Sequence, residues 1–118
     1  MSCIFCKIIN KEESADIVYE DHKFIVIKNI QPKAPVHLLI IPKEHIPSVN
    51  HFNNQHKELI GELFLIAKSI AKKQGIAEKG YKLVFNVGKG GGQVIFHLHL
   101  HLLGGWKTKN SRYVQKMP

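Results

Sequence analysis

Long apolar runs are missing from this sequence of 118 residues. Its first residues form neither the apolar stretch of a signal peptide nor an arginine-rich amphipathic arm, and no later segment approaches the ~18 apolar residues of a membrane span. Internal repeats and low-complexity segments are also missing. We therefore expect a cytoplasmic protein with no membrane partner, folded as a single domain over residues 1–118 around one core.

Acidic residues are few, with 9 Asp and Glu against 17 Lys and Arg, and the formal net charge is +8. Such an excess favours phosphate-bearing or nucleic-acid partners, although a generally basic proteome or an effect on solubility would give the same balance. The lysines are scattered, and neither an arginine cluster nor a platform of aromatic residues accompanies them. Binding to nucleic acid would rest on charge alone, and we do not expect it.

Cysteine is scarce as well, since Cys3 and Cys6 are the only two. In a reducing compartment such a pair favours a metal site or a redox pair over a structural disulfide. A thioredoxin-like redox pair would follow a strand, and no strand precedes Cys3. A metal site is therefore favoured, but two cysteines supply only half of a tetrahedral site, and a free pair stays open as the alternative.

Histidine, in contrast, is concentrated in one stretch, where His97, His99 and His101 alternate with large apolar residues before Gly104-Gly105. Because successive side chains of a strand point to opposite faces, this pattern predicts a strand with three imidazoles on one face. The other face would join the core through Phe96, Leu98, Leu100 and Leu102.

Two kinds of chemistry suit three histidines on one strand. Positions i and i+4 of a strand lie about 13.5 Å apart, so one metal ion would bind all three only if the strand bent sharply. Imidazole stays largely neutral near pH 7 and is then a nucleophile, while a neighbouring imidazole can donate a proton. The row of histidines therefore favours attack on phosphorus over a metal centre made of three histidines.

The run from His97 to Leu103, preceded by Gly91-Gly92-Gln93, resembles the histidine triad family of nucleotide hydrolases and transferases. The Hint branch of that family, the purine nucleoside phosphoramidases, is similar over nearly the whole chain up to Gly105. The segments that carry this wider resemblance are Cys3-Ile4-Phe5-Cys6-Lys7-Ile8-Ile9, Ala34-Pro35-Val36-His37, Ile40-Ile41-Pro42-Lys43-Glu44-His45 and Asn86.

The resemblance implies an α+β fold with an antiparallel sheet of about five strands, one long helix and a short N-terminal helix, assembled as a homodimer. It also implies hydrolysis at the α-phosphorus of purine nucleoside monophosphate derivatives, above all adenosine phosphoramidates. In that reaction His99 would attack phosphorus, His101 would donate to a phosphoryl oxygen, and the carbonyl of His97 would orient the His99 ring. Two other functions stay open, namely a nucleotide-binding scaffold with slight activity and a dinucleoside polyphosphate hydrolase.

The glycine-rich loop from Gly88 to Gly92 is either a hairpin turn or a phosphate cradle, and its place beside the histidines favours the cradle. By resemblance, the backbone around Gly92, Gln93 and Val94 would stabilise the charge of the transition state, and Asn86 would hold the phosphate or the loop. Val94 departs from the Hint pattern, which usually has Ser or Thr here. Since valine has no hydroxyl, we expect slower turnover of phosphoramidates.

In the zinc-bearing members that this sequence resembles, two histidines complete the cysteine pair. The implied ligands are Cys3, Cys6, His45 and His97, around a structural Zn²⁺, because four protein ligands leave no open position for substrate. Spacing alone does not choose His45 over the other histidines between residues 37 and 56.

The resemblance also places the base between apolar residues of the first helix and of the following hairpin. The implied contacts are Ile4, Phe5, Ile8, Ile27 and Ile30, although such residues are ordinarily core aliphatics. Asn29 stands where the Hint branch commonly has an aspartate that accepts hydrogen bonds from the ribose hydroxyls. An asparagine lacks the charged acceptor with two oxygens, so we expect weaker ribose binding.

Hydrophobic periodicity predicts helices over 3–10 and 55–74 and strands over 17–19, 24–27, 36–41, 81–86 and the histidine run. Asn53 or Asn54 can cap the long helix, and Gly75 suits its end. His37, inside a mostly buried strand, is expected to be a core histidine. The tail over 106–118 does not align with the family, so the choice of substrate stays open.

Overall fold

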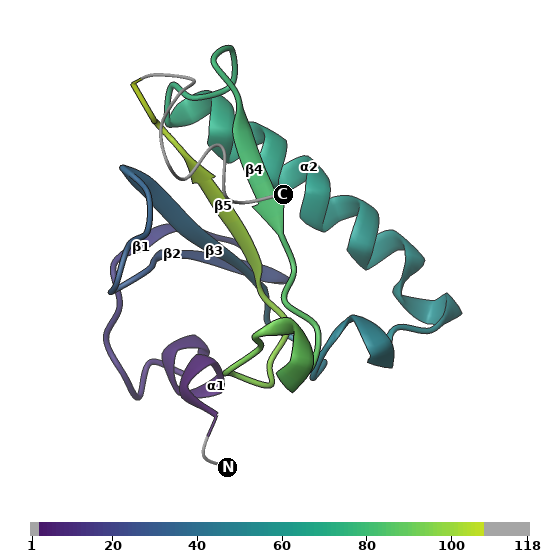
Figure 1. The fold of residues 1–118 in the computed structure, drawn as a ribbon. Helices are drawn as coiled ribbons and strands as arrows, with labels where there is room; N and C mark the ends of the chain where they lie inside the picture. The colour runs from purple at the N-terminus through teal and green to yellow at the C-terminus, as the bar shows by residue number, and fades with distance from the viewer. Residues whose placement is uncertain (1–2, 108–118) are drawn as a thin grey trace.

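A five-stranded antiparallel sheet forms the centre of the computed structural model, which describes residues 3–107 (Figure 1). The strands are β1 (Ile17–Glu20), β2 (Phe24–Lys28), β3 (Val36–Pro42), β4 (Tyr81–Val84) and β5 (Leu100–Gly104). Their order in the sheet is β1-β2-β3-β5-β4, so β5 lies between β3 and β4. The two α-helices are α1 (Ile4–Ile9) and α2 (Lys57–Lys73). The α+β fold class and the number of strands predicted from the sequence are confirmed.

Both faces of the sheet are buried, because side chains of its inner strands alternate between two apolar clusters. In β2, Phe24 and Val26 join the cluster under α2, while Ile25 and Ile27 join the cluster under α1. In β3 the even-numbered Leu38 and Ile40 face α2, and the odd-numbered Leu39 and Ile41 face α1. The face that carries α1 is therefore the face on which odd-numbered residues of β3 lie.

The long helix begins later than its sequence pattern predicts. A 3-10 turn, Asn54–His56, precedes α2, and the side chain of Asn53 caps that turn by accepting a hydrogen bond from Gln55 N–H. The helix ends at Lys73, before Gly75, whose φ of 74° is readily adopted by glycine. The apolar stripe of α2 packs on the sheet as predicted, through Leu63, Ala67, Ile70 and Ala71.

The predicted strand over the histidine run is wrong in its first half, since β5 begins only at Leu100. The last pair in the ladder between β3 and β5 is Ile40 with Leu100. The ladder does not continue past this pair because Pro42, the next residue of β3 that would donate to this strand, has no N–H. Leu98 N–H instead donates to the carbonyl of Ile46 at 2.7 Å. The expectation that Phe96 joins the core is also wrong, because its side chain is 42% exposed.

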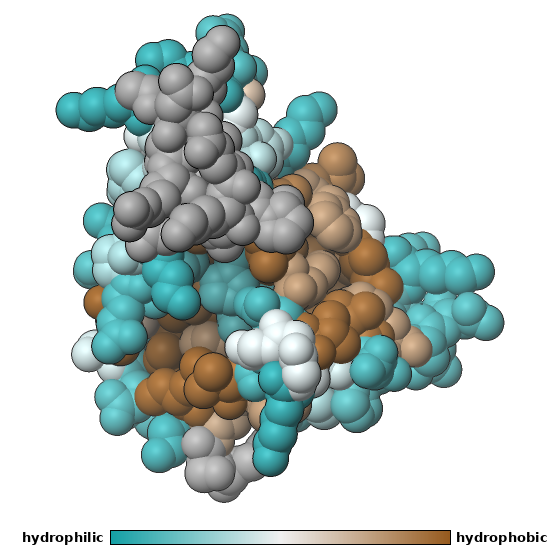
Figure 2. Space-filling model, viewed as in Figure 1, coloured by the Kyte–Doolittle hydropathy of each residue, from teal (hydrophilic) through white to brown (hydrophobic). Residues whose placement is uncertain are grey.

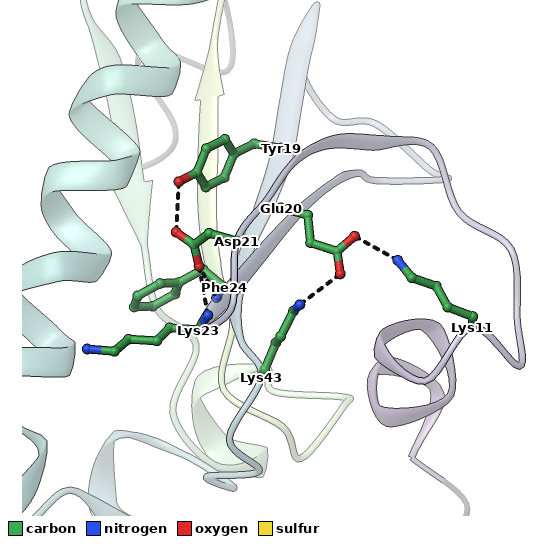
Figure 3. A network of polar contacts seen from close by, with 7 residues as sticks. All are labelled: Lys11, Tyr19, Glu20, Asp21, Lys23, Phe24 and Lys43. Carbon is green, nitrogen blue, oxygen red and sulfur yellow. Dashed lines mark hydrogen bonds and ion pairs between the residues drawn. The ribbon is translucent and has the colours of Figure 1, made fainter.

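Polar contacts fix the β1–β2 hairpin to the elements around it (Figure 3). The carboxylate of Asp21 accepts hydrogen bonds from the N–H groups of Lys23 and Phe24, each at 2.8 Å, which shapes the turn. Glu20 pairs with Lys11, just after α1, and with Lys43, just after β3, at 2.7 and 2.8 Å. These ion pairs connect the hairpin to the segment after α1 and to the segment after β3.

Residues 3–107 include no helix long and apolar enough to cross a membrane. The predicted C-terminal tail over 106–118 lies, from residue 108 onward, outside the described residues.

Candidate active site and metal centre

Three histidines lie in contact on the α1 face of the sheet. His101 is opposite Leu39 in the β3–β5 ladder, so His37, two residues before Leu39, shares its face. His37 Nε2 lies 2.9 Å from His101 Nδ1, and the His99 and His101 ring centroids are 5.0 Å apart. His99 precedes β5 in irregular backbone. Two of these rings were expected at the site, whereas His37 was expected to be a core residue.

Hydrogen bonds determine the tautomers of His37 and His101. The backbone N–H of Lys33 donates to His37 Nδ1 at 3.0 Å, so this nitrogen carries a lone pair and the ring proton is on Nε2. His37 Nε2–H therefore donates to His101 Nδ1. In turn, the proton of neutral His101 is on its Nε2, which is therefore a hydrogen-bond donor.

His99 has the opposite tautomer. Its Nδ1 lies 2.8 Å from the carbonyl oxygen of His97, which can only accept, so the proton of His99 is on Nδ1. The Nε2 of a neutral His99 consequently carries a free lone pair. The ring of Phe5, on α1, packs edge-on against His99 with centroids 5.1 Å apart. A nucleophilic nitrogen and an N–H donor thus belong to adjacent rings.

Burial keeps these rings uncharged near neutral pH. It lowers the pKa of His37 and of His99, because water is withdrawn from the charged form. For His101, burial and then the nearby bases His99, His37 and Lys33 lower the pKa to about 4. Neutral rings are the form in which His99 can attack and in which the tautomers just described hold.

Cys3, Cys6, His45 and His97 form a second group, with one donor atom each and all four atoms within 4.8 Å of one another. Cys3 Sγ lies 3.4 Å and Cys6 Sγ 3.6 Å from His97 Nδ1. Cys6 Sγ lies 3.3 Å from His45 Nδ1, and the two Nδ1 atoms are 3.0 Å apart. The four residues that the resemblance named as ligands are therefore brought together from α1, the segment after β3 and the segment before β5.

His97 connects the two groups. It is fully buried, and its Nε2–H donates to the carbonyl of Pro42 at 2.8 Å, which leaves a lone pair on Nδ1 for the cysteine and histidine cluster. Its own carbonyl accepts the hydrogen bond from His99. The backbone that orients His99 is thus held by a residue whose ring belongs to the candidate metal centre.

The apolar residues expected around a base divide into two sets. Phe5, Ile8 and Ile27 are buried and belong to one cluster between α1 and the sheet. Ile4 is 38% exposed and Ile30 is 94% exposed, so the structure does not bring them into that cluster. Asn29 lies beside the histidines, with its Nδ2 3.2 Å from His37 Nε2.

The glycine-rich loop is held by side chains rather than open to an anion along its whole length. Asn86 Nδ2 donates to the carbonyl of Gly91 at 2.9 Å. Gln93 accepts from Gly88 N–H at 2.9 Å and donates to the carbonyls of Pro47 and Ile95. The backbone N–H groups of Gly92 and Gln93, expected to face a phosphate, bond instead to Lys89 and Gly88 carbonyls. Val94 is 87% exposed.

A groove of about 260 Å³ lies away from the histidines. It is formed between β1 and α2, on the face of the sheet opposite α1, and its lining residues are Tyr19, Asp21, Glu62, Leu65, Ile66, Ser69 and Ile70. Its position separates it from the chemistry described above.

Comparison with known proteins now adds to this geometry. The family model described as "Scavenger mRNA decapping enzyme C-term binding" matches residues 2–115. A solved HIT family hydrolase from Legionella pneumophila superposes with a TM-score of 0.88 at 48% identity, covering 90% of this chain and 95% of that one. The chain belongs to the histidine triad family. It is therefore an enzyme of a family that includes hydrolases.

Other histidine triad proteins agree with this placement. Protein HitA of Neisseria gonorrhoeae is 48% identical over 103 residues, covering 87% of this chain and 95% of that protein. The purine nucleoside phosphoramidase of Escherichia coli K12 is 46% identical over 102 residues, covering 86% of each. A zinc-bound histidine triad protein from Mycobacterium smegmatis superposes with a TM-score of 0.78 at 28% identity, covering 93% of this chain and 79% of that one.

Proposed function

We propose that this protein hydrolyses purine nucleoside phosphoramidates, with adenosine phosphoramidate as the representative substrate, through a nucleotidyl group bound to His99. The observation that carries the proposal is the pair of opposite tautomers. His99 Nδ1 donates to the His97 carbonyl and leaves Nε2 free, while His101 is held by His37 with its proton on Nε2. The similarity to a purine nucleoside phosphoramidase supports the choice of substrate class.

In the first step, the Nε2 lone pair of His99 forms a bond to the α-phosphorus and the bond from phosphorus to the leaving amine breaks. The amine leaves after taking one proton from solvent, and His101 Nε2–H donates a hydrogen bond to a phosphoryl oxygen. In the second step, water attacks the same phosphorus and gives up one proton to solvent, the bond to His99 breaks, and the nucleoside monophosphate leaves. Holding the imidazole in place replaces a poorly positioned water as the first attacking group.

The sequence departures affect how this substrate would be held. The exposed Val94 offers no hydroxyl to the phosphate or to the leaving nitrogen. The base would lie against Phe5, with Ile8 and Ile27 beneath it, while the exposed Ile4 and Ile30 could contact it only from the rim. If the protein binds adenylate tightly but turns over phosphoramidates slowly, it is better described as a nucleotide-binding scaffold with slight activity than as a phosphoramidase.

We also propose a structural zinc ion at Cys3, Cys6, His45 and His97. Tetrahedral zinc with bonds of about 2.0–2.3 Å has ligand atoms about 3.3–3.8 Å apart. The three separations that involve sulfur, 3.3 to 3.6 Å, fall in this range, and the two Nδ1 atoms are somewhat closer at 3.0 Å. The likeness to a zinc-bound family member supports the choice of metal. The ion would fasten α1 to the segment before β5.

Finally, we propose that the protein is a homodimer joined through α2 and β4. On α2, Phe64 is 42% and Leu65 66% exposed, and Phe85, just after β4, packs edge-on against Phe64. Figure 2 shows apolar side chains gathered over this region of the surface. In addition, β4 is an edge strand of the sheet. Light scattering should find a dimer for the wild type and a monomer for Leu65→Lys. Glu12→Gln, which changes the net charge by the same +1 outside this surface, is the control and should remain a dimer.

The activity is tested by measuring release of adenylate from adenosine phosphoramidate. Replacing His99 by Ala should lower kcat by about 10³-fold or more, because no other group in the row has a free lone pair in position. His22→Ala, in the exposed β1–β2 turn, serves as the control and should retain wild-type turnover. Undiminished activity in His99→Ala would refute the proposed function.

A further inference from the structure

Asn29 contacts the histidine row at its outer end. The residue directly follows β2, and its side chain lies between the backbone of Gln31 and the ring of His37. Asn29 Oδ1 accepts a hydrogen bond from Gln31 N–H at 3.0 Å, and Nδ2 lies 3.2 Å from His37 Nε2. The backbone N–H of Asn29 also donates to the carbonyl of His37 at 3.0 Å. Asn29 is thus held against His37 by both its backbone and its side chain.

The amide of Asn29 does not match the atom it faces. His37 Nε2 carries a proton, because its Nδ1 accepts from Lys33 N–H, and that proton is donated to His101. The Nδ2 of Asn29 is therefore a donor beside another donor. Turning the amide by half a rotation moves the mismatch to Gln31, since Nδ2 would then face a backbone N–H. No orientation of an asparagine satisfies both neighbours.

An aspartate at this position would satisfy both neighbours. One carboxylate oxygen would accept from Gln31 N–H, and the other would accept from the Nε2 side of His37. Its negative charge would lie about 3 Å from a partly buried pair of imidazoles, where an opposite charge strongly favours an additional proton. The residue at position 29 therefore shifts the pH at which the pair becomes cationic.

We propose that Asn29 is a positioning residue that acts on His101 through His37, and that its amide lets this pair of rings stay uncharged to a lower pH than a carboxylate would. An additional proton on the pair would have to sit on His101 Nδ1 or His37 Nδ1, and either site breaks one of the hydrogen bonds that fix the tautomers. The pair would then no longer present His101 Nε2–H in one defined orientation. The inference rests on the proposed function only in taking His101 as the donor to the phosphoryl group.

The groups around His37 and His101 also disfavour an additional proton on these two rings. After burial, His99 from the segment before β5 and then Lys33 from the loop after Asn29 lower the pKa of His101. Lys33 also lowers the pKa of His37, after burial. From β4, the residue paired with His101 is the uncharged Val84. A carboxylate at position 29 would oppose these bases, so its effect should be large enough to measure.

The test is a titration of the ring nitrogens of His37 and His101 by ¹⁵N NMR in the substrate-free protein. In the wild type both rings should show the Nε2–H tautomer at pH 7. Asn29→Asp should raise the pKa of the pair by about one to two units, a change of about 10- to 100-fold in proton affinity. Gln31→Asp, which adds the same charge two residues away on an exposed side chain, should raise it by less than a third of that amount.

An Asn29→Asp shift no larger than that of Gln31→Asp would overturn the inference, and so would a His37 that titrates as an imidazolium at pH 7 in the wild type. Because no turnover is needed, this result is independent of whether the protein hydrolyses phosphoramidates. If the protein does so, the acidic limb of kcat/KM should move to higher pH in Asn29→Asp by the same shift. An unmoved limb together with a shifted NMR titration would remove His101 from the proposed mechanism and leave the role of Asn29 intact.

Discussion

Protonation of His101 should destabilise the folded chain. Burial lowers its pKa from an ordinary value of 6.5 to about 4. Between these values the unfolded chain binds a proton that the folded chain does not, so stability rises with pH across this window. The contribution of a neutral His101 is therefore complete above pH 6.5 and is lost as the pH falls towards 4.

The size of this effect follows from the two pKa values. A difference of 6.5 − 4 corresponds to about 3 kcal/mol once both states are protonated. At pH 4.5 nearly every unfolded His101 is protonated and the folded form only partly, so about 2 kcal/mol should be lost relative to pH 7. His101→Gln removes the titrating group but keeps an oxygen that can accept from His37 Nε2–H.

Urea unfolding followed by circular dichroism at pH 7 and pH 4.5 measures this loss. The wild type should lose about 2 kcal/mol more than His101→Gln between the two conditions, because the other titrating groups act on both proteins. His22→Gln, in the exposed β1–β2 turn, is the control and should behave as the wild type. If His101→Gln loses as much stability as the wild type, to within about 0.5 kcal/mol, His101 is not a buried neutral base.

Three further substitutions test other parts of the structure. A Cβ at Gly104 would lie 2.8 Å from Ile76 Cδ1 and 3.2 Å from Tyr81 Cβ, which is fixed to the backbone of β4, so Gly104→Ala should cost about 1–3 kcal/mol in urea unfolding. Apart from its chain neighbours and the backbone of its own helix, a Cβ at Gly61 would have no atom within 4 Å, so Gly61→Ala should be neutral or stabilising. Equal effects would contradict the packing described at the end of β5. Cys6→Ser should remove bound zinc, measured by mass spectrometry of the metal, and lower Tm by more than about 5 °C, and an unchanged metal content would exclude the proposed site. Asn86→Ala should lower kcat/KM about tenfold while costing about 1 kcal/mol, because the glycine-rich loop loses its anchor; wild-type kcat/KM would show that the loop does not need it.

Much of the fold could be predicted because local patterns determine it. The nearly continuous apolar, β-rich runs Phe24–Ile27 and Val36–Ile41 predicted two strands, and both are buried on both faces of the sheet. The apolar stripe of α2 and its capping residue could likewise be recognised from neighbouring residues alone. The length of the histidine strand could not, because it depends on where the neighbouring strand stops donating hydrogen bonds, at Pro42.

The candidate site was harder to predict, because it depends on contacts across the sheet. His37 was assigned to the core, and it is indeed buried, but its ring contacts His101, which is 64 positions away in the sequence. Only the register of β3 against β5 brings these two together, and no hairpin turn joins these strands to fix that register locally. His45 was chosen as a ligand from the resemblance alone. The alternation of His37 with Leu39 and Ile41 was the one available signal that it shares their face.

The most direct test of the central claim is to look for the nucleotide on His99. Wild type and His99→Ala should be mixed briefly with adenosine phosphoramidate, quenched at neutral or alkaline pH to preserve a phosphorus–imidazole bond, and weighed by intact-protein mass spectrometry. We expect the wild type to gain one nucleotidyl group that fragmentation assigns to His99, and the variant to gain none. An adduct of equal yield in the variant, or adenylate release by the wild type with no adduct at any mixing time, would contradict nucleophilic catalysis by His99.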